Sequence, residues 1–323
     1  METKSAFLAR SSRRETLKET AQETLRVLPA LLTELGTATD ARRSTKHTLD
    51  NSRRLDPAYC PRFPEPATIE VVNDDTLNIG VALALSSAKD MQITHGEEHY
   101  HNPRPVIVNF AERKRPGGGW LHGAVAQEET LCYRSSLYLS LDKRHYPLSS
   151  KEAEAIYSPY VVVVRDSLDN GHRLLGGGRR DLPVVSALSV AAVRDPEVRR
   201  VSRLAGPGEQ QEQQHQHQPL VLPLHAEDKL VFRRNRDRNF TKDNMRLILR
   251  VAAYNRHREL VLGALGCGAY ENPPEDVAHC WLEVLREDEF AGHWWRKVLF
   301  VVYDSGSERN YKIFSRVLQG QKV

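Results

Sequence analysis

Apolar residues near the N-terminus recur at intervals of three and four, which is the spacing of an amphipathic helix. They are Leu17, Ala21, Leu25, Leu28, Leu32 and Leu35. Pro29 falls inside this stripe and predicts a kink or two consecutive helices, because proline cannot donate the helical hydrogen bond. Gly36 is predicted to end the helix. Residues 37–66 are polar and contain four prolines, so we interpret them as connecting structure.

Downstream, short apolar runs alternate with stretches of helical periodicity. The runs predict strands over 69–72, 105–110, 160–164, 182–188, 260–265 and 298–303. The periodic stretches predict helices around 77–85 and over 124–140, 245–253, 273–286 and 311–318. Strands that alternate with helices indicate an α/β fold with a largely parallel or mixed sheet. Ligands of such sheets bind in loops at the carboxyl ends of the strands.

One segment lacks both patterns. Residues 206–218 read GPGEQQEQQHQHQ and contain almost no apolar side chains. Such a composition cannot bury a core, so we predict a disordered insert over 204–219. A metal site at His215 and His217 is the alternative, but the composition favours a solvated loop.

The overall composition is that of a globular protein with a substantial core. Hydrophobic residues make up 40% of the 323 positions, and the formal net charge is only +4. This charge does not call for nucleic acid as a partner. No apolar run reaches the length of a membrane span, so no membrane partner is expected either.

The cysteines bear on metal binding and compartment. No CxxC pair occurs among Cys60, Cys132, Cys267 and Cys280, so no zinc site is predicted. So few cysteines indicate a reducing intracellular compartment, cytoplasmic or nuclear. The N-terminus lacks the apolar region of a secretory signal, while Arg10, Arg13 and Arg14 leave a mitochondrial presequence open as the alternative.

The sharpest motif follows the strand predicted over 105–110. It reads Pro116 and three glycines, Gly117, Gly118 and Gly119, then seven residues, then Gln127, Glu128 and Glu129. Glycines let the backbone approach a ligand, and their N–H groups can cradle a diphosphate. The helix dipole favours ionised carboxylates in the first turn, whereas a bound anion would raise the pKa of a nearby carboxyl. A second triple glycine, 176–178, has no carboxylate pair behind it and is interpreted as a connecting loop.

This motif resembles the signature of the microbial-type poly(ADP-ribose) glycohydrolase (PARG) family, which is GGG, a short spacer and QEE. The stretch 108–111, VNFA, and the later PGGGWLHGAVAQEETLCYRSSLYLSL carry the resemblance. Residues 262–270, LGALGCGAY, with NPP at 272–274, resemble the second phosphate-binding loop of the family, usually written GCGAF. The resemblance covers most of the chain apart from the insert.

The resemblance implies a macrodomain-like fold, a three-layer α/β/α arrangement with a mixed central sheet and an N-terminal helical extension. We expect the extension and linker over 1–66 and the catalytic domain over 67–323. The implied activity is hydrolysis of ribose–ribose O-glycosidic bonds, which releases ADP-ribose. The implied partners are poly(ADP-ribose) and ADP-ribosylated proteins, with no metal and no cofactor.

The resemblance also implies roles for residues of the first loop. Glu129 corresponds to the catalytic acid, and Glu128 would bind and orient the ribose at the scissile bond. Gln127 would support the loop, which Gly117, Gly118 and Gly119 line. Asn109, at the end of the strand, would contact the terminal ribose.

In the second loop, the backbone would wrap the diphosphate along Gly266, Cys267, Gly268, Ala269 and Tyr270. Tyr270 departs from the usual phenylalanine, which leaves rate and substrate preference open. Cys267 is expected to be a small buried side chain rather than a nucleophile.

Three other functions remain as alternatives. The first is removal of single ADP-ribose units from proteins or small molecules. The second is a non-catalytic macrodomain that binds ADP-ribose, against which Glu128 and Glu129 argue, because a reader needs neither acid. The third is an interaction protein with a relic pocket, which retention of both glycine loops disfavours.

Overall fold

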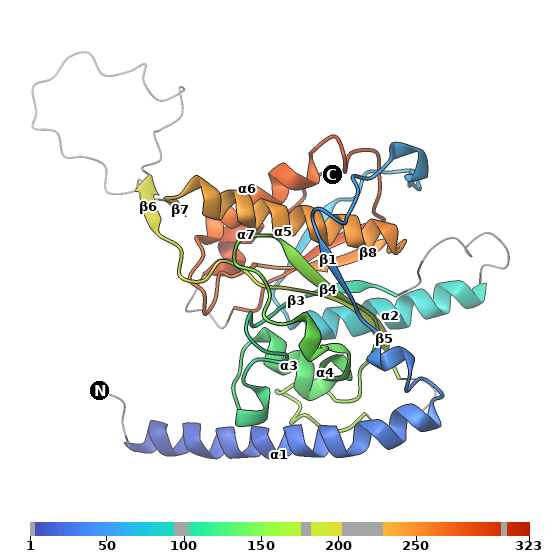
Figure 1. Ribbon diagram of the computed structural model, residues 1–323, viewed down its shortest axis with the longest axis vertical. Coiled ribbons are helices and arrows are strands. Elements are labelled where there is room, and N and C mark those ends of the chain that lie inside the picture. The colour runs from blue at the N-terminus through green and yellow to red at the C-terminus, as the bar shows by residue number, and fades with distance from the viewer. Residues whose placement is uncertain (1–3, 94–101, 103, 176–181, 202–228, 305–308) are drawn as a thin grey trace, which may run out of the picture.

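A computed structural model describes residues 4–93, 102, 104–175, 182–201, 229–304 and 309–323. Seven strands form one sheet in the order β1-β4-β5-β3-β8-β9-β2 (Figure 1). Their bounds are β1 Thr45–Thr48, β2 Ile69–Val72, β3 Val106–Phe110, β4 Glu154–Val162, β5 Val184–Val190, β8 Glu259–Leu262 and β9 Lys297–Val301. The five strands from β5 to β2 are mutually parallel, while β4 and β1 are antiparallel to their neighbours. The sheet is therefore mixed, as predicted.

Helices cover both faces of this sheet (Figure 1). One face carries α5 Asn235–Tyr254, α6 Pro274–Leu285 and α7 Asn310–Leu318. The other carries α2 Thr76–Ile93, α3 Gln127–Arg134 and α4 Leu137–Ser140, with α1 Lys4–Glu34 packed outside them. This arrangement confirms the predicted three-layer α/β/α fold.

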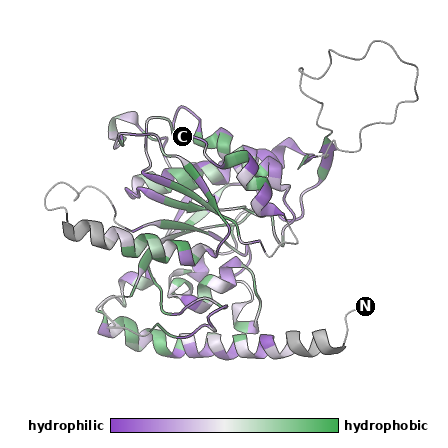
Figure 2. Cartoon of the chain, turned by 180° about the vertical axis from the view of Figure 1, so that it is seen from behind, coloured by the Kyte–Doolittle hydropathy of each residue, from purple (hydrophilic) through white to green (hydrophobic). Residues whose placement is uncertain are grey.

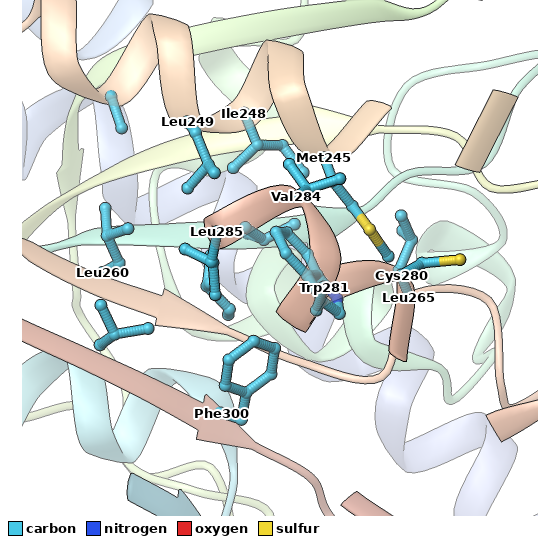
Figure 3. Close-up of a cluster of buried hydrophobic side chains, with 14 of the residues drawn as sticks. Met245, Ile248, Leu249, Leu260, Leu265, Cys280, Trp281, Val284, Leu285 and Phe300 are labelled. Carbon is cyan, nitrogen blue, oxygen red and sulfur yellow. The ribbon is translucent and has the colours of Figure 1, made fainter. Parts of the chain in front are cut away.

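The central strands bury side chains on both faces. In β3, Val106 and Val108 pack under α5 and α6, whereas Ile107 between them packs on the side of α2 and α3. Because successive strand residues point to opposite faces, such strands must be apolar throughout. Figure 2 shows the hydrophobic strands inside a more polar exterior, and Figure 3 shows the core around Trp281, whose Nε1 donates to Gly263 O at 3.1 Å.

The N-terminal apolar stripe forms one helix rather than two consecutive helices. Pro29 lies inside α1, which runs without interruption to Glu34. Leu28 and Leu32, on either side of Pro29, are buried against Val162 and Val164. We attribute the continuity to this packing, which offsets the hydrogen bond that proline cannot make. Gly36 ends the helix with a positive φ of 68°, as predicted.

The segment 37–66 is not only connecting structure. Thr45–Thr48 forms β1, which pairs with β4 at the edge of the sheet. A run of four residues, TKHT, with no apolar alternation carries no strand signal of its own. Pairing with β4 decides its conformation, so this part of the prediction was wrong.

The helix predicted over 124–140 is also wrong in one respect, because it is two helices. Between α3 and α4, Ser135 adopts an extended conformation and forms a bridge with Val163. The Ser136 hydroxyl accepts a hydrogen bond from Val162 N at 2.9 Å. These contacts with the strand replace helical hydrogen bonds and break the helix.

The sequence pattern did not predict the two-stranded hairpin that the structure contains. It consists of β6 Val198–Val201 and β7 Lys229–Phe232. The predicted insert over 204–219 lies outside the described residues, as does the second triple glycine, 176–178. Within the described part of the chain, no helix is both long enough and apolar enough to cross a membrane.

Candidate active site

Two loops predicted to bind substrate meet at one edge of the sheet. The first follows β3 and the second follows β8, and these two strands are parallel neighbours. A Cβ built on Gly263, just after β8, would lie 2.9 Å from Phe110 Cζ at the end of β3. The structure therefore brings both loops to the carboxyl ends of adjacent strands, where α/β sheets bind ligands.

Gln127 joins the start of α3 to the end of β3. Its Oε1 accepts a hydrogen bond from Phe110 N at 2.7 Å, and its Nε2 donates to Val108 O at 2.8 Å. Nε2 also lies 3.2 Å from Thr76 Oγ1 at the start of α2. The amide thus sets the position of the two glutamates that follow it.

Glu128 is buried, with 2% of its surface exposed. Its Oε1 accepts from Asn109 Nδ2 at 3.2 Å, and its Oε2 accepts from Glu112 N at 2.7 Å. Burial raises the pKa of Glu128 to about 8, with a smaller contribution from the charge of Glu129. Burial therefore favours the protonated form of this carboxyl.

Asn109 is fully buried beneath Glu128. Its Nδ2 also donates to Ser189 Oγ of β5 at 3.0 Å. Its Oδ1 has no hydrogen-bond partner among the described residues. Because a buried acceptor without a partner is costly, this oxygen suits a ligand hydroxyl better than an empty site.

The carboxylate of Glu129 lies inside the first glycine loop. Its Oε1 accepts from Gly119 N at 2.9 Å, and its Oε2 accepts from Ala126 N at 3.1 Å. A Cβ on Gly118 would lie 2.4 Å from Oε1, and Gly118 has a φ of 53°. Only glycine fits there, because any larger residue would displace the carboxylate.

The outer side of this loop rests on aromatic residues and on α1. A Cβ on Gly117 would meet the buried Trp120 at 2.8 Å. The Tyr133 hydroxyl lies 2.8 Å from Trp120 O. Arg14 of α1 donates through Nε to the carbonyl of His122 at 2.7 Å. The N-terminal helix therefore braces the loop that holds Glu129, while the His122 side chain is exposed.

The second loop is more open. Gly266 has a φ of 74°, and a Cβ there would lie 2.5 Å from Asn272 Nδ2. That amide lies 2.7 Å from Val193 O and 3.1 Å from Tyr270 O, so it closes the loop. Gly268 and Ala269 are exposed, and a Cβ on Gly268 would meet no described atom within 4 Å.

Tyr270 ends this loop half-buried. The guanidinium of Arg194 lies over its ring, 5.7 Å from the centroid. Burial raises the pKa of the Tyr270 hydroxyl, with a smaller contribution from the charge of Glu112. The Cys267 side chain is buried and its Sγ lies 3.7 Å from Leu265 O, so this residue presents its backbone to the site and its side chain to the core.

Sequence reasoning missed three residues of the site. Asn272 was quoted only as a landmark, although its amide organises the second loop. Ser189 supports Asn109 from β5. Tyr146 has a buried hydroxyl without a hydrogen-bond partner among the described residues, and burial and the nearby Glu128 raise its pKa. Tyr146 lies in no motif, so only the tertiary structure reveals it.

The described residues contain no cluster of His, Cys, Asp and Glu suited to a metal ion. A cavity of about 950 Å³ lies away from the two glycine loops, between the 53–61 segment and the end of α5. None of the predicted site residues lines it.

Residues 21–166 match the family model of the microbial-type PARG catalytic domain. That range includes the first glycine loop and both glutamates but not the second loop. No curated protein matches the sequence.

Solved structures match over nearly the whole chain. Poly(ADP-ribose) glycohydrolase from Thermomonospora curvata has 24% identity and a TM-score of 0.63, covering 94% of this chain and 99% of that one. The Deinococcus radiodurans enzyme in complex with ADP-ribose has 25% identity and a TM-score of 0.60, covering 87% and 96%. The N-terminal half of the chain is therefore similar to the microbial-type PARG catalytic domain, and nearly the whole chain shares the fold of the solved structures.

Proposed function

We propose that this protein hydrolyses the ribose–ribose O-glycosidic bonds of poly(ADP-ribose) and releases ADP-ribose. The observation that carries the proposal is the pair of carboxyls at the start of α3. Glu129 is held inside the glycine loop by Gly119 N and Ala126 N, and Glu128 is buried against Asn109. We also propose that the protein acts inside the cell.

The reaction needs a proton donor for the departing ribose oxygen as an oxocarbenium-like centre develops. In our proposal, Glu129 donates that proton and then takes one from the attacking water. Most glycosidases divide these steps between two carboxyls, and here the second, Glu128, orients the ribose instead. Its raised pKa suits this role, because a protonated carboxyl donates to one ribose oxygen while it accepts from another hydroxyl.

The second loop would hold the diphosphate. Exposed backbone around Gly268 and Ala269 can present N–H groups to phosphate oxygens. Asn109 Oδ1, buried without a described partner, would accept from a ribose hydroxyl. The Deinococcus structure contains ADP-ribose, which supports this assignment of the ligand.

The test is release of ADP-ribose from poly(ADP-ribose) by wild type and Glu129→Gln, measured by chromatography. Glutamine keeps the shape but cannot donate a carboxyl proton, so the rate should fall at least about 100-fold. Glu152→Gln, at an exposed glutamate, is the control and should retain full activity.

A mono-ADP-ribosylated peptide as second substrate separates the alternatives. Release from the peptide alone would favour the mono-ADP-ribosyl hydrolase. Binding of ADP-ribose by wild type without release from either substrate would contradict the hydrolase and favour the reader.

A further inference from the structure

The hairpin of β6 and β7 concentrates the positive charge of the chain. Residues 194–201 and 229–238 lead into the hairpin, form its strands and leave it. They contain eight basic and three acidic side chains, a net charge of +5, against +4 for the whole chain. The rest of the chain together therefore carries no net positive charge.

This charged hairpin is joined to the candidate active site. The chain reaches it from the carboxyl end of β5, beside Asn109 and the second glycine loop. Asp195 N donates to Tyr270 O at 3.1 Å, and Arg194 lies over the Tyr270 ring. On the other strand, Phe232 N donates to Asp276 of α6 at 3.0 Å. The base of the hairpin is thus held against the predicted diphosphate loop, and its strands extend beyond α6 (Figure 1).

The basic side chains of this region fall into two groups. Arg234 pairs with Glu197, and Arg238 pairs with Asp276 at 2.9 Å, so these cations already have partners. Arg199 and Arg200 are exposed on β6, and neither forms an ion pair with another described residue. Because consecutive strand residues point to opposite faces, the two guanidinium groups lie on the two sides of the hairpin.

We propose that Arg199 and Arg200 bind phosphates of the substrate polymer beyond the unit held in the active site. This inference rests on the proposed function. Each unit of poly(ADP-ribose) carries a diphosphate, so the polymer is a chain of regularly spaced anions. Exposed guanidinium groups bind phosphate through charge-assisted, often bidentate hydrogen bonds. The attachment of the hairpin to Tyr270 favours this polymer over nucleic acid, because the same chain can occupy the site and continue along the hairpin.

The proposal separates binding of the polymer from binding of one unit. A single ADP-ribose would contact the two glycine loops only, whereas the polymer would also contact the hairpin. Neutralising the two arginines should therefore weaken polymer binding and leave ADP-ribose binding unchanged. Each lost phosphate contact should also reduce the salt dependence of polymer binding.

The experiment measures affinity for fluorescently labelled long polymer and for ADP-ribose at several salt concentrations, in the Glu129→Gln background. The test variant is Arg199→Gln with Arg200→Gln. The control is Arg42→Gln with Arg43→Gln, which removes two adjacent exposed arginines near the opposite end of the sheet. We expect polymer affinity to fall about tenfold in the test variant only, with a shallower salt slope.

Equal polymer affinity in the test and control variants would overturn the proposal. A parallel loss of ADP-ribose affinity would also overturn it, because it would indicate distortion of the site. Competition by single-stranded RNA as strong as by the polymer, at equal phosphate concentration, would indicate a nucleic-acid surface instead. Failure of the hydrolase proposal would look different: wild type would bind polymer through the hairpin but release no ADP-ribose.

Discussion

Both loops are rich in glycine, but protein atoms enclose the first loop whereas the second borders open space. In the first, the space beside each of Gly117, Gly118 and Gly119 is filled by protein atoms, among them a carboxylate oxygen of Glu129. In the second, Gly263 and Gly266 meet such crowding at the base of the loop, whereas Gly268 faces open space. The first loop needs glycine to enclose a catalytic group. The second needs it to form a tight turn and to leave room for a ligand.

The largest effect is expected where the crowding is most severe. Gly118→Ala should lower kcat about 100-fold, because the new Cβ would displace the Glu129 carboxylate by a large fraction of an ångström. Gly171→Ala is the matched control, since Gly171 has a φ of 74° but no described atom within 4 Å of its Cβ. Similar losses of activity in both variants, measured with equal amounts of folded protein, would mean that backbone strain alone matters.

Within the second loop, Gly266→Ala and Gly268→Ala should behave differently. Gly266→Ala should destabilise the protein by about 1–3 kcal/mol, because it combines a positive φ with a clash against Asn272. Gly268→Ala should leave the unfolding free energy unchanged and weaken ADP-ribose binding, since its Cβ enters the open space. Denaturant unfolding and calorimetric titration measure the two effects, and unchanged ADP-ribose affinity in Gly268→Ala would place the ligand elsewhere.

The enclosure of the first loop should also give a gradual dependence of stability on pH. The pKa of Glu128 is about 8 in the folded protein, against 4.5 for its ordinary value. Between these values the folded state binds more protons than the unfolded state, so stability falls as pH rises. Relative to Glu128→Gln, the wild type should lose about 1 kcal/mol per pH unit across that window.

Denaturant unfolding of both proteins from pH 5 to pH 8.5 measures this difference. At pH 5 the folded state keeps the Glu128 proton while most unfolded chains have lost it, so the stability of the wild type relative to the variant should fall from there up to about pH 8. A constant difference between the two proteins over the whole range would show that burial does not raise the pKa of Glu128. The exposed second loop has no buried carboxyl, so no comparable pH dependence is expected from it.

The sequence predicted strands where apolar residues form a run or alternate with polar ones. The strand over 105–110 coincides with β3 almost to the residue, because an uninterrupted apolar run has few alternatives. The edge strand β2 coincides with the prediction over 69–72, where buried Ile69 and Val71 alternate with exposed Glu70. Two other strands gave no such signal. Neither β1 nor β6 has apolar alternation, and each is a strand because a neighbouring strand supplies its hydrogen bonds.

In the candidate active site, too, the sequence predicted some features and missed others. By itself, the sequence determined the local chemistry: two glycine loops after apolar strands, a glutamate pair in a first helical turn, and the resemblance to the PARG family. It did so because spacing along one chain segment controls which groups share a loop or a helix face. The assigned roles of Glu129, Glu128 and the loop residues remain predictions.

Only the tertiary structure decided which distant groups surround those motifs. Parallel pairing of β3 and β8 places the two loops side by side, although some 150 residues separate them. It also buries Glu128 against Asn109, brings Tyr146 near that carboxyl and packs α1 behind the first loop. The physical reason is that burial and the raised pKa of Glu128 depend on contacts between remote segments, which no local pattern of residues encodes.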